Sequence, residues 1–194
     1  MKHEGWPSGL SEHAAPLLDR YLALLLRYAL PRGMISTADA AQVRERHLAD
    51  SLRALPALTP SERAVDMGSG AGLPGVPLAI AVPDLHVVLA ESRRTRIAFL
   101  ELVIDELGLQ NASVHAGRVE DLPRAFDVAL ARGFGDAGDS WRAAREVLTR
   151  AGRLFYWAGA SFDAARVAPE NAQVEVLEQP GLESQGPLVI MTRQ

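Results

Sequence analysis

Apolar and polar positions follow two different periods over the last two thirds of the chain. Short apolar runs typical of buried strands alternate there with longer segments whose apolar residues recur at helical spacing. Strands that alternate with helices predict a mostly parallel sheet with right-handed crossovers. The expected strands cover residues 64–67, 86–90, 112–115, 126–131 and 153–157, and the expected helices cover about 75–82, 95–107 and 139–149.

The end of the chain breaks this alternation. Gln173 to Leu177 and Leu188 to Met191 both have the composition of strands, and Pro180-Gly181 between them is a turn signal. No helical pattern separates the two runs, so we expect an antiparallel hairpin. With the five preceding strands this hairpin would complete a mostly parallel, seven-stranded sheet.

Two helices are predicted before the first strand. Ser11 can cap a helix whose leucines form a broad apolar face up to Pro31. Ser36-Thr37-Ala38-Asp39 resembles a capping box and opens a second helix that runs to about residue 55. The predicted division of the chain is a helical extension, residues 1–60, and an α/β domain, residues 61–194.

A glycine-rich turn joins the first predicted strand to the helix after it. The glycines recur at alternate positions in Asp66-Met67-Gly68-Ser69-Gly70-Ala71-Gly72-Leu73-Pro74-Gly75. Glycine lets the backbone adopt positive φ and approach a ligand closely, and the N-terminus of the next helix offers unpaired N–H groups. A strand, a tight glycine turn and a helix in that order predict a cofactor-binding site.

The glycines by themselves are compatible with two cofactors. Gly70 to Gly75 matches the dinucleotide pattern G-x-G-x-x-G, whereas Asp66 to Gly72 matches D-x-G-x-G-x-G, a pattern associated with S-adenosylmethionine (SAM) enzymes. Pro74 and Pro77 each remove an N–H group that a pyrophosphate would need, and SAM carries no phosphate. The residues favour SAM and leave a nicotinamide cofactor as the alternative.

Composition narrows the possible chemistry. The chain has no cysteine, so disulfides, thiolate metal ligands and cysteine nucleophiles are excluded, and its five histidines show no metal-ligand spacing. No apolar stretch reaches the roughly 20 residues of a membrane span and no signal peptide is visible, so a cytoplasmic protein without membrane or metal is expected. The net charge of −4 argues against indiscriminate binding to nucleic acid and is compatible with a local basic face.

Acidic residues follow the second and third predicted strands. Glu91 is placed to bind the two ribose hydroxyls of an adenosine cofactor, and capping of the next helix is the alternative. The main-chain N–H of Val119 or Glu120 could contact the edge of an adenine, and a solvated acidic loop is the alternative there.

Arg132 ends the fourth predicted strand. Because ligands bind outside the carboxyl ends of strands in open α/β sheets, its side chain is expected to point into the site, toward the cofactor's carboxylate or the acceptor. A surface salt bridge is the alternative. His47 and Asp50 share one face of the second predicted helix, where they form either a general-base pair or an ordinary hydrogen bond on the helix surface.

Five segments, in order, resemble the signatures of one protein family. Arg46 to Ser51 is similar to R-H-x-x-D-S, and Asp66 to Pro77 is similar to D-x-G-[ST]-G-x-G-L-P-G-[IV]-P. Glu91 to Leu100 is similar to D-S-x-x-K-R-x-x-F-L, Gly117 to Glu120 contains R-[AV]-E, and Arg132 to Phe134 is similar to the end of S-R-A-F. The family is that of the bacterial RsmG-type methyltransferases, also called glucose-inhibited division protein B (GidB). Its members methylate N7 of a guanine near the decoding site of 16S ribosomal RNA.

The resemblance implies a Rossmann-like class I methyltransferase fold and SAM as methyl donor, with S-adenosylhomocysteine as product. It also implies a monomeric enzyme whose partner is small-subunit ribosomal RNA or the small ribosomal subunit. It puts cofactor contacts at Gly68, Leu73, Val119, Glu120 and Arg132, which join Asp66, Gly70, Gly72 and Glu91 in the predicted cofactor site.

The resemblance also places His47 and Asp50 near the substrate entrance, so the expected catalytic set is Arg132, His47 and Asp50. N7 of a neutral guanine already carries a lone pair, so no general base is required. Alignment of the reactants can supply roughly 7–11 kcal/mol. Arg132 is therefore expected to position the acceptor.

Four features depart from the family's pattern. The serine of S-R-A-F is Ala131, and the family's N-L-T stretch is matched only faintly by Gly33 to Thr37. Two family lysines are replaced, by Thr95 in the third segment and by Ala158 after the fifth strand. Two further hypotheses therefore stand beside 16S rRNA methylation: a divergent paralogue that methylates another RNA or a small molecule, and a SAM-binding ribosome-associated module with little catalysis.

Overall fold

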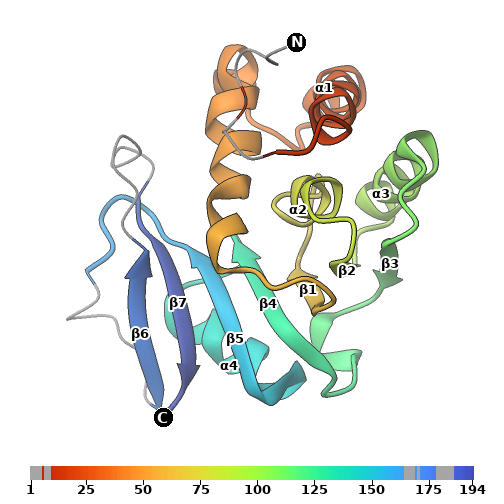
Figure 1. Ribbon diagram of the computed structural model, residues 1–194. Coiled ribbons are helices and arrows are strands. Elements are labelled where there is room, and N and C mark those ends of the chain that lie inside the picture. Colours follow the sequence, from red (N-terminus) through yellow and green to blue (C-terminus); the bar gives the residue numbers. More distant parts are fainter. Residues whose placement is uncertain (1–5, 7–9, 164–168, 170, 178–185) are drawn as a thin grey trace.

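The computed structural model describes residues 6, 10–163, 169, 171–177 and 186–194 (Figure 1). One sheet has the strand order β3-β2-β1-β4-β5-β7-β6. The strands are β1 (Arg63–Met67), β2 (His86–Glu91), β3 (Ala112–Ala116), β4 (Phe126–Arg132), β5 (Leu148–Trp157), β6 (Ala172–Leu177) and β7 (Leu188–Arg193). The α-helices are α1 (Ala14–Leu24), α2 (Gly75–Ala81), α3 (Arg94–Leu107) and α4 (Ala137–Val147).

The strand directions confirm the predicted α/β class. Strands β1 to β5 pair in parallel, with β1 in the middle between β2 and β4. Strand β7 pairs antiparallel with both β5 and β6, which is the predicted closing hairpin. The turn predicted at Pro180-Gly181 lies outside the described residues.

One predicted boundary was wrong. The helix expected over 139–149 ends at Val147, and β5 begins directly at Leu148 instead of at residue 153. Leu148 pairs with Phe126 and the register then shifts, so that Arg153 pairs with Val128. The backbone passes closely here, because a Cβ on Gly152 would lie 3.0 Å from the Phe126 carbonyl oxygen. A bulge of this kind leaves no periodic signal in the sequence.

The helical extension is less regular than predicted. After α1 the helix first widens in η1 (Leu25–Ala29, π) and then tightens in η2 (Leu30–Arg32, 3₁₀). The second predicted helix is a series of short turns: η3 (Thr37–Gln42, 3₁₀), η4 (Arg44–Ala49, π) and η5 (Leu52–Ala57, 3₁₀). Both predicted serines bind backbone at these helix starts, since the Ser11 hydroxyl accepts the Ala14 N–H and the Ser36 hydroxyl accepts the Ala38 N–H, each at 3.2 Å, while the reciprocal bond of a capping box stays a prediction.

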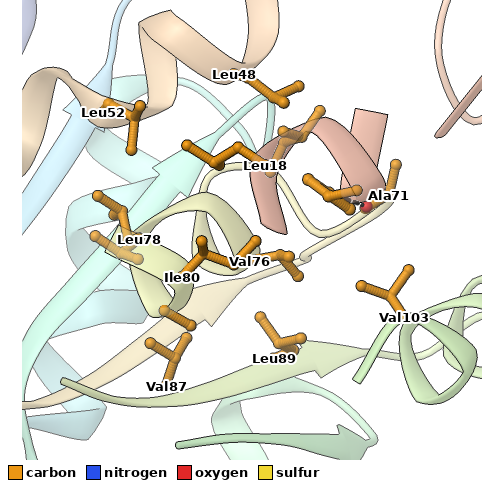
Figure 2. Close-up of a cluster of buried hydrophobic side chains, with 14 of the residues drawn as sticks. Leu18, Leu48, Leu52, Ala71, Val76, Leu78, Ile80, Val87, Leu89 and Val103 are labelled. Atoms are coloured by element: carbon orange, nitrogen blue, oxygen red, sulfur yellow. Dashed lines mark hydrogen bonds between the residues drawn. The ribbon is translucent and has the colours of Figure 1, made fainter. Parts of the chain in front are cut away.

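The sheet has a hydrophobic core on each face. One face packs against α4, and the other packs against α1, α2, α3 and the extension. Figure 2 shows this second core, where Leu18 of α1 and Leu48 and Leu52 of the extension face Val76, Leu78 and Ile80 of α2. Leu18 and Leu48 are both 0% exposed, and full burial of one leucine is worth roughly 1.5–3 kcal/mol. The extension and the sheet thus share one core, and the boundary predicted between residues 60 and 61 stays a prediction.

Figure 1 shows the extension beside the carboxyl ends of β4 and β5. Because β1 to β5 all run in the same direction, the carboxyl ends of these strands lie at one edge of the sheet. This edge, with the extension next to it, carries the candidate site.

Candidate active site

A cavity of about 250 Å³ lies at the carboxyl ends of β1 and β2, next to the 3₁₀ turn η6 (Val119–Asp121). Four residues of the predicted cofactor site line it, namely Gly68, Glu91, Val119 and Glu120. The other lining residues are Ala90, Ser92, Gly117, Arg118 and Phe134. The segments that follow β1, β2, β3 and β4 therefore all reach the same cavity, as expected for an open parallel sheet, whereas the segment Arg46 to Ser51 does not line it.

Glu91 is a buried, ionised carboxylate at this cavity. Its Oε1 accepts the N–H groups of Ser92 and Arg93 at 2.8 and 2.9 Å, and its Oε2 accepts the N–H of Gly70 at 3.1 Å. Burial raises the pKa of Glu91, but the three backbone donors and the nearby Arg96 guanidinium lower it by more, so the net shift is downward. Ser92 and Arg93 both precede the first residue of α3, so these bonds do not satisfy the N–H groups of the first helical turn as the predicted alternative, capping of that helix, would require.

The glycine turn after β1 is shaped by contacts on both of its sides. Gly68 has φ +66°, and a Cβ there would lie 3.0 Å from the ring of Phe134, which lines the cavity. Gly72 has φ +93°, and a Cβ there would lie 2.7 Å from Val76 and 2.9 Å from the hydroxyl of Tyr21. The absence of a side chain at Gly68 makes room for the Phe134 ring at the cavity, and its absence at Gly72 lets Val76 and Tyr21 of the core pack against the turn.

Asp66 lies beneath this turn, at 1% exposure. Its Oδ2 accepts the Gly75 N–H at 3.0 Å, and its Oδ1 has no hydrogen-bond partner in the described part of the chain. Burial raises the pKa of Asp66 to about 7, because the Gly75 N–H, the Ser69 side chain and the positive charge of Arg132 lower it by less than the loss of water raises it. The carboxylate therefore fixes the start of α2, and contact between Asp66 and the cofactor stays a prediction. Leu73 is likewise buried, at 8% exposure.

The three predicted catalytic residues form one cluster, in which Arg132 contacts both His47 and Asp50. Its Nε donates to Asp50 Oδ2 at 3.1 Å, and its Nη2 lies 2.8 Å from His47 Nδ1 and 3.1 Å from the Arg46 carbonyl oxygen. A guanidinium has only donors, so His47 Nδ1 must accept, which puts the imidazole proton on Nε2. The side chain of Arg132 is thus turned toward the extension, where its partner Asp50 lies 82 residues earlier in the sequence.

Asp50 is held from several directions. Besides Arg132, its carboxylate accepts from Arg53 Nη1 at 2.9 Å, and its main-chain carbonyl accepts from the indole N–H of Trp157 at 2.9 Å. The side chains of Asp50 and Arg53 are 6% and 4% exposed. The pair between Arg132 and Asp50 is partly buried, so neither the surface salt bridge nor the surface hydrogen bond considered above describes this cluster.

Sequence reasoning missed four residues of this region. Arg53 and Trp157 fix Asp50, Tyr21 contacts the glycine turn, and Phe134 lines the cavity. Phe134 lies in the matched R-G-F segment and Arg53 is three residues after Asp50, so each had a local signal. Tyr21 and Trp157 had none, because their partners are distant in the sequence.

The fold and the site together define a class of protein, the Rossmann-like SAM-dependent methyltransferases. A mutant of MtNAS in complex with S-adenosylmethionine superposes with a TM-score of 0.63 at 18% identity, covering 93% of this chain and 76% of that chain. A precorrin-6y C5,15-methyltransferase from Geobacter metallireducens has a TM-score of 0.54 at 17% identity, covering 75% and 87% of the two chains. At these identities the likeness concerns the fold alone.

Within this class the chain belongs to the GidB family, rRNA small subunit methyltransferase G, whose model matches residues 14–185. The ribosomal RNA small subunit methyltransferase G of Ralstonia nicotianae is 38% identical over 192 residues, which cover 90% of this chain and 86% of that protein. The resemblance seen in the five sequence segments is thereby confirmed.

Among the described residues, no helix has both the length and the apolar character needed to cross a membrane. The same residues contain no group of three or more histidine and carboxylate side chains arranged to hold a metal ion. The predicted monomeric state and the predicted independence of metal ions stay predictions.

Proposed function

We propose that this protein transfers the methyl group of SAM to N7 of a guanine in the 16S ribosomal RNA of the small subunit. Membership of the GidB family carries this proposal. The cavity at the strand ends supports it, because its residues suit an adenosine cofactor without phosphates.

The cavity residues fit the parts of SAM one by one. The ionised Glu91 can accept a ribose hydroxyl, since its three backbone donors leave one of the roughly four acceptor positions of a carboxylate. The Arg96 guanidinium approaches Glu91 Oε2 only to 3.5 Å, so the second ribose hydroxyl would bind Glu91 in place of Arg96. The N–H groups of Val119 and Glu120 would contact the adenine edge, and Gly68 keeps the turn open beside the ring of Phe134. Bound SAM supplies an electrophilic methyl group on a positively charged sulfur, which the carboxylates of Glu91 and Glu120 would attract.

The remaining predicted cofactor residues would act from behind the turn. Asp66 holds the first N–H of α2, and Gly70 donates to Glu91. Gly72 and Leu73 belong to the buried side of the turn. We propose that these four residues shape the cofactor site and that Arg132 borders it.

Methyl transfer to N7 requires that the protein align the two reactants, and it requires no proton transfer. N7 of guanine attacks with a lone pair it already has, and no proton leaves before the methyl group moves. His47 accepts from Arg132 and keeps its proton on Nε2, so the cluster is arranged to hold an acceptor in place. Reactant alignment can be worth roughly 7–11 kcal/mol, and we assign this positioning role to Arg132, His47 and Asp50.

The structure bears on the alternative of a divergent paralogue. Ala131 is 0% exposed and Ala158 is 5% exposed, so two of the departures from the family pattern fall in the packed interior. Thr95 alone of these three lies on the surface. This placement favours the family substrate over a new one.

The test is methyl transfer from labelled SAM to small ribosomal subunits that lack the modification, with the labelled nucleotide mapped. We expect N7-methylguanine at one site, and a loss of about 10²-fold or more in Arg132→Ala, since misplaced reactants lose rate steeply. Arg142→Ala, which changes an arginine 73% exposed on α4, is the matched control and should keep full activity. Label at another atom, or in another RNA only, would contradict the proposal.

A further inference from the structure

Tyr21 reaches from the extension into the inner side of the glycine turn. Its side chain is 0% exposed, and its hydroxyl donates to the main-chain carbonyl of Ala71 at 2.6 Å. Figure 2 shows Ala71 close to Leu18 of α1, with the hydrogen bond drawn beside it. The two partners are 50 residues apart in the sequence, so this bond directly ties the extension to the turn.

The turn is clamped at this point from two sides. The Ala71 carbonyl accepts from Tyr21, and the N–H of the preceding residue, Gly70, donates to Glu91 at 3.1 Å. The first bond comes from the core and the second from the carboxylate that lines the cavity. The path of these two residues between the core and the cavity is therefore set by a tyrosine and a glutamate that are distant from each other in sequence.

The space around the clamp leaves little freedom. A Cβ on Gly72 would lie 2.9 Å from the Tyr21 hydroxyl and 3.2 Å from Leu100. Tyr21 thus occupies the volume that a side chain at residue 72 would need. The turn cannot move toward the core without displacing the ring, and it cannot move away without losing the hydrogen bond.

The Tyr21 hydroxyl stays protonated at neutral pH. Burial raises the pKa of Tyr21 well above its ordinary value, and the negative charge of Asp66 raises it further, against a smaller opposing effect of Arg132. A neutral hydroxyl is a constant donor, so the bond to Ala71 does not depend on pH in the neutral range.

We propose that Tyr21 is a positioning residue for the cofactor, holding the glycine turn in the conformation that binds SAM. The proposal rests on the proposed function, because it takes SAM as the ligand of the cavity. It gives the extension a role at the cofactor in addition to the expected one at the RNA, since α1 would control how well the turn is ordered before SAM arrives.

The decisive variant is Tyr21→Phe, which removes one oxygen and leaves the Ala71 carbonyl buried without a donor. Such a loss weakens an interaction by about tenfold. We expect the Kd for SAM, measured by calorimetry, and the KM for SAM, measured on small subunits, both to rise on the order of tenfold. The kcat at saturating SAM should stay within about twofold, because the Arg132 cluster is unchanged.

Two controls separate this role from a purely structural one. Tyr28→Phe removes a hydroxyl from the same extension for which the described residues offer no hydrogen bond, and it should change neither Kd nor stability. Leu25→Ala removes a 0% exposed leucine four residues after Tyr21, and it should lower the Tm while leaving the Kd for SAM unchanged in the folded protein.

A Tyr21→Phe protein with a lower Tm and an unchanged Kd and KM for SAM would overturn the inference. An equal rise of Kd in Leu25→Ala would overturn it as well, because any loosening of α1 would then suffice. A wild-type protein that binds no SAM would instead refute the proposed function, which is a different result from a variant that binds as well as the wild type.

Discussion

The two ends of the candidate site are built in different ways. At the cavity end, Glu91 is held by backbone N–H groups of Gly70, Ser92 and Arg93, two of which are its immediate neighbours in the chain. At the other end, Arg132 is held by side chains and a carbonyl of the extension, more than eighty residues away. The first end depends on local backbone geometry, and the second depends on how the extension packs.

This difference separates two ways in which the site can fail. A change at the cavity end should alter cofactor binding, while a change at the arginine end should alter the acceptor step and the packing of the extension. Five further substitutions, beyond those at Arg132 and Tyr21, test that separation.

The largest effect is expected from Asp50→Ala. It removes the carboxylate of the buried ion pair between Asp50 and Arg53, and removal of one partner of a buried pair costs about 3–5 kcal/mol. Urea denaturation should show this loss, and methyl transfer should fall by about 10²-fold or more as Arg132 loses its orientation. The Kd for SAM should change by less than about twofold, because backbone donors hold the cavity end.

The exposed pair of Arg142 and Asp139 is the matched control for this substitution, since its side chains are 73% and 60% exposed. Arg142→Ala should cost no more than about 1 kcal/mol. A large rise in the Kd for SAM in Asp50→Ala would show that the two ends are not separate.

The next effect concerns the two sides of the glycine turn. Gly72→Ala places a methyl group 2.7 Å from Val76 at φ +93°, and should cost about 2–4 kcal/mol in the free energy of unfolding. At Gly70 φ is +60°, and the nearest atom to an added Cβ outside the neighbouring residues, the Gly68 carbonyl oxygen, is 3.8 Å away. For Gly70→Ala we therefore expect only backbone strain of about 1–2 kcal/mol. Equal losses in the two variants would mean that the core contacts of Gly72 do not matter.

The last comparison separates the carboxylates at the ends of β1 and β2 by the pH dependence of the free energy of unfolding. Burial raises the pKa of Asp66 from 3.8 to about 7, so its contribution to stability is full below pH 4 and is lost as the pH rises through 7. Asp66→Asn cannot ionise and keeps an oxygen for Gly75. Its stability relative to the wild type should therefore increase between pH 5 and 7, by at most about 1.4 kcal/mol per pH unit.

Glu91→Gln is the counterpart, because the pKa of Glu91 is shifted downward. The stabilisation that Glu91 gives is present above its unfolded pKa of 4.5 and is lost only in more acidic solution. Between pH 5 and 8 the stability difference from the wild type should stay constant. Unfolding free energies measured at several pH values would contradict this interpretation if both variants gave the same slope.

The sequence alone determined the parts of the protein whose physics is local. Alternation of strand and helix periods, glycines at alternate positions and the caps at Ser11 and Ser36 all depend on neighbouring residues, and the fold class and cavity position followed from them. The position of Glu91 after the second predicted strand led to a residue that lines the cavity, whereas only the structure shows that Arg132 contacts His47 and Asp50.

The tertiary structure decided which side of each local element faces the cavity. Asp66 and Gly72 lie in the glycine pattern, yet their contacts are with the core, because α1 and α2 pack against that side of the turn. The bond from Trp157 to Asp50 and the bond from Tyr21 to Ala71 each join segments far apart in sequence. Such contacts follow from packing of whole elements, and no local pattern of residues encodes them.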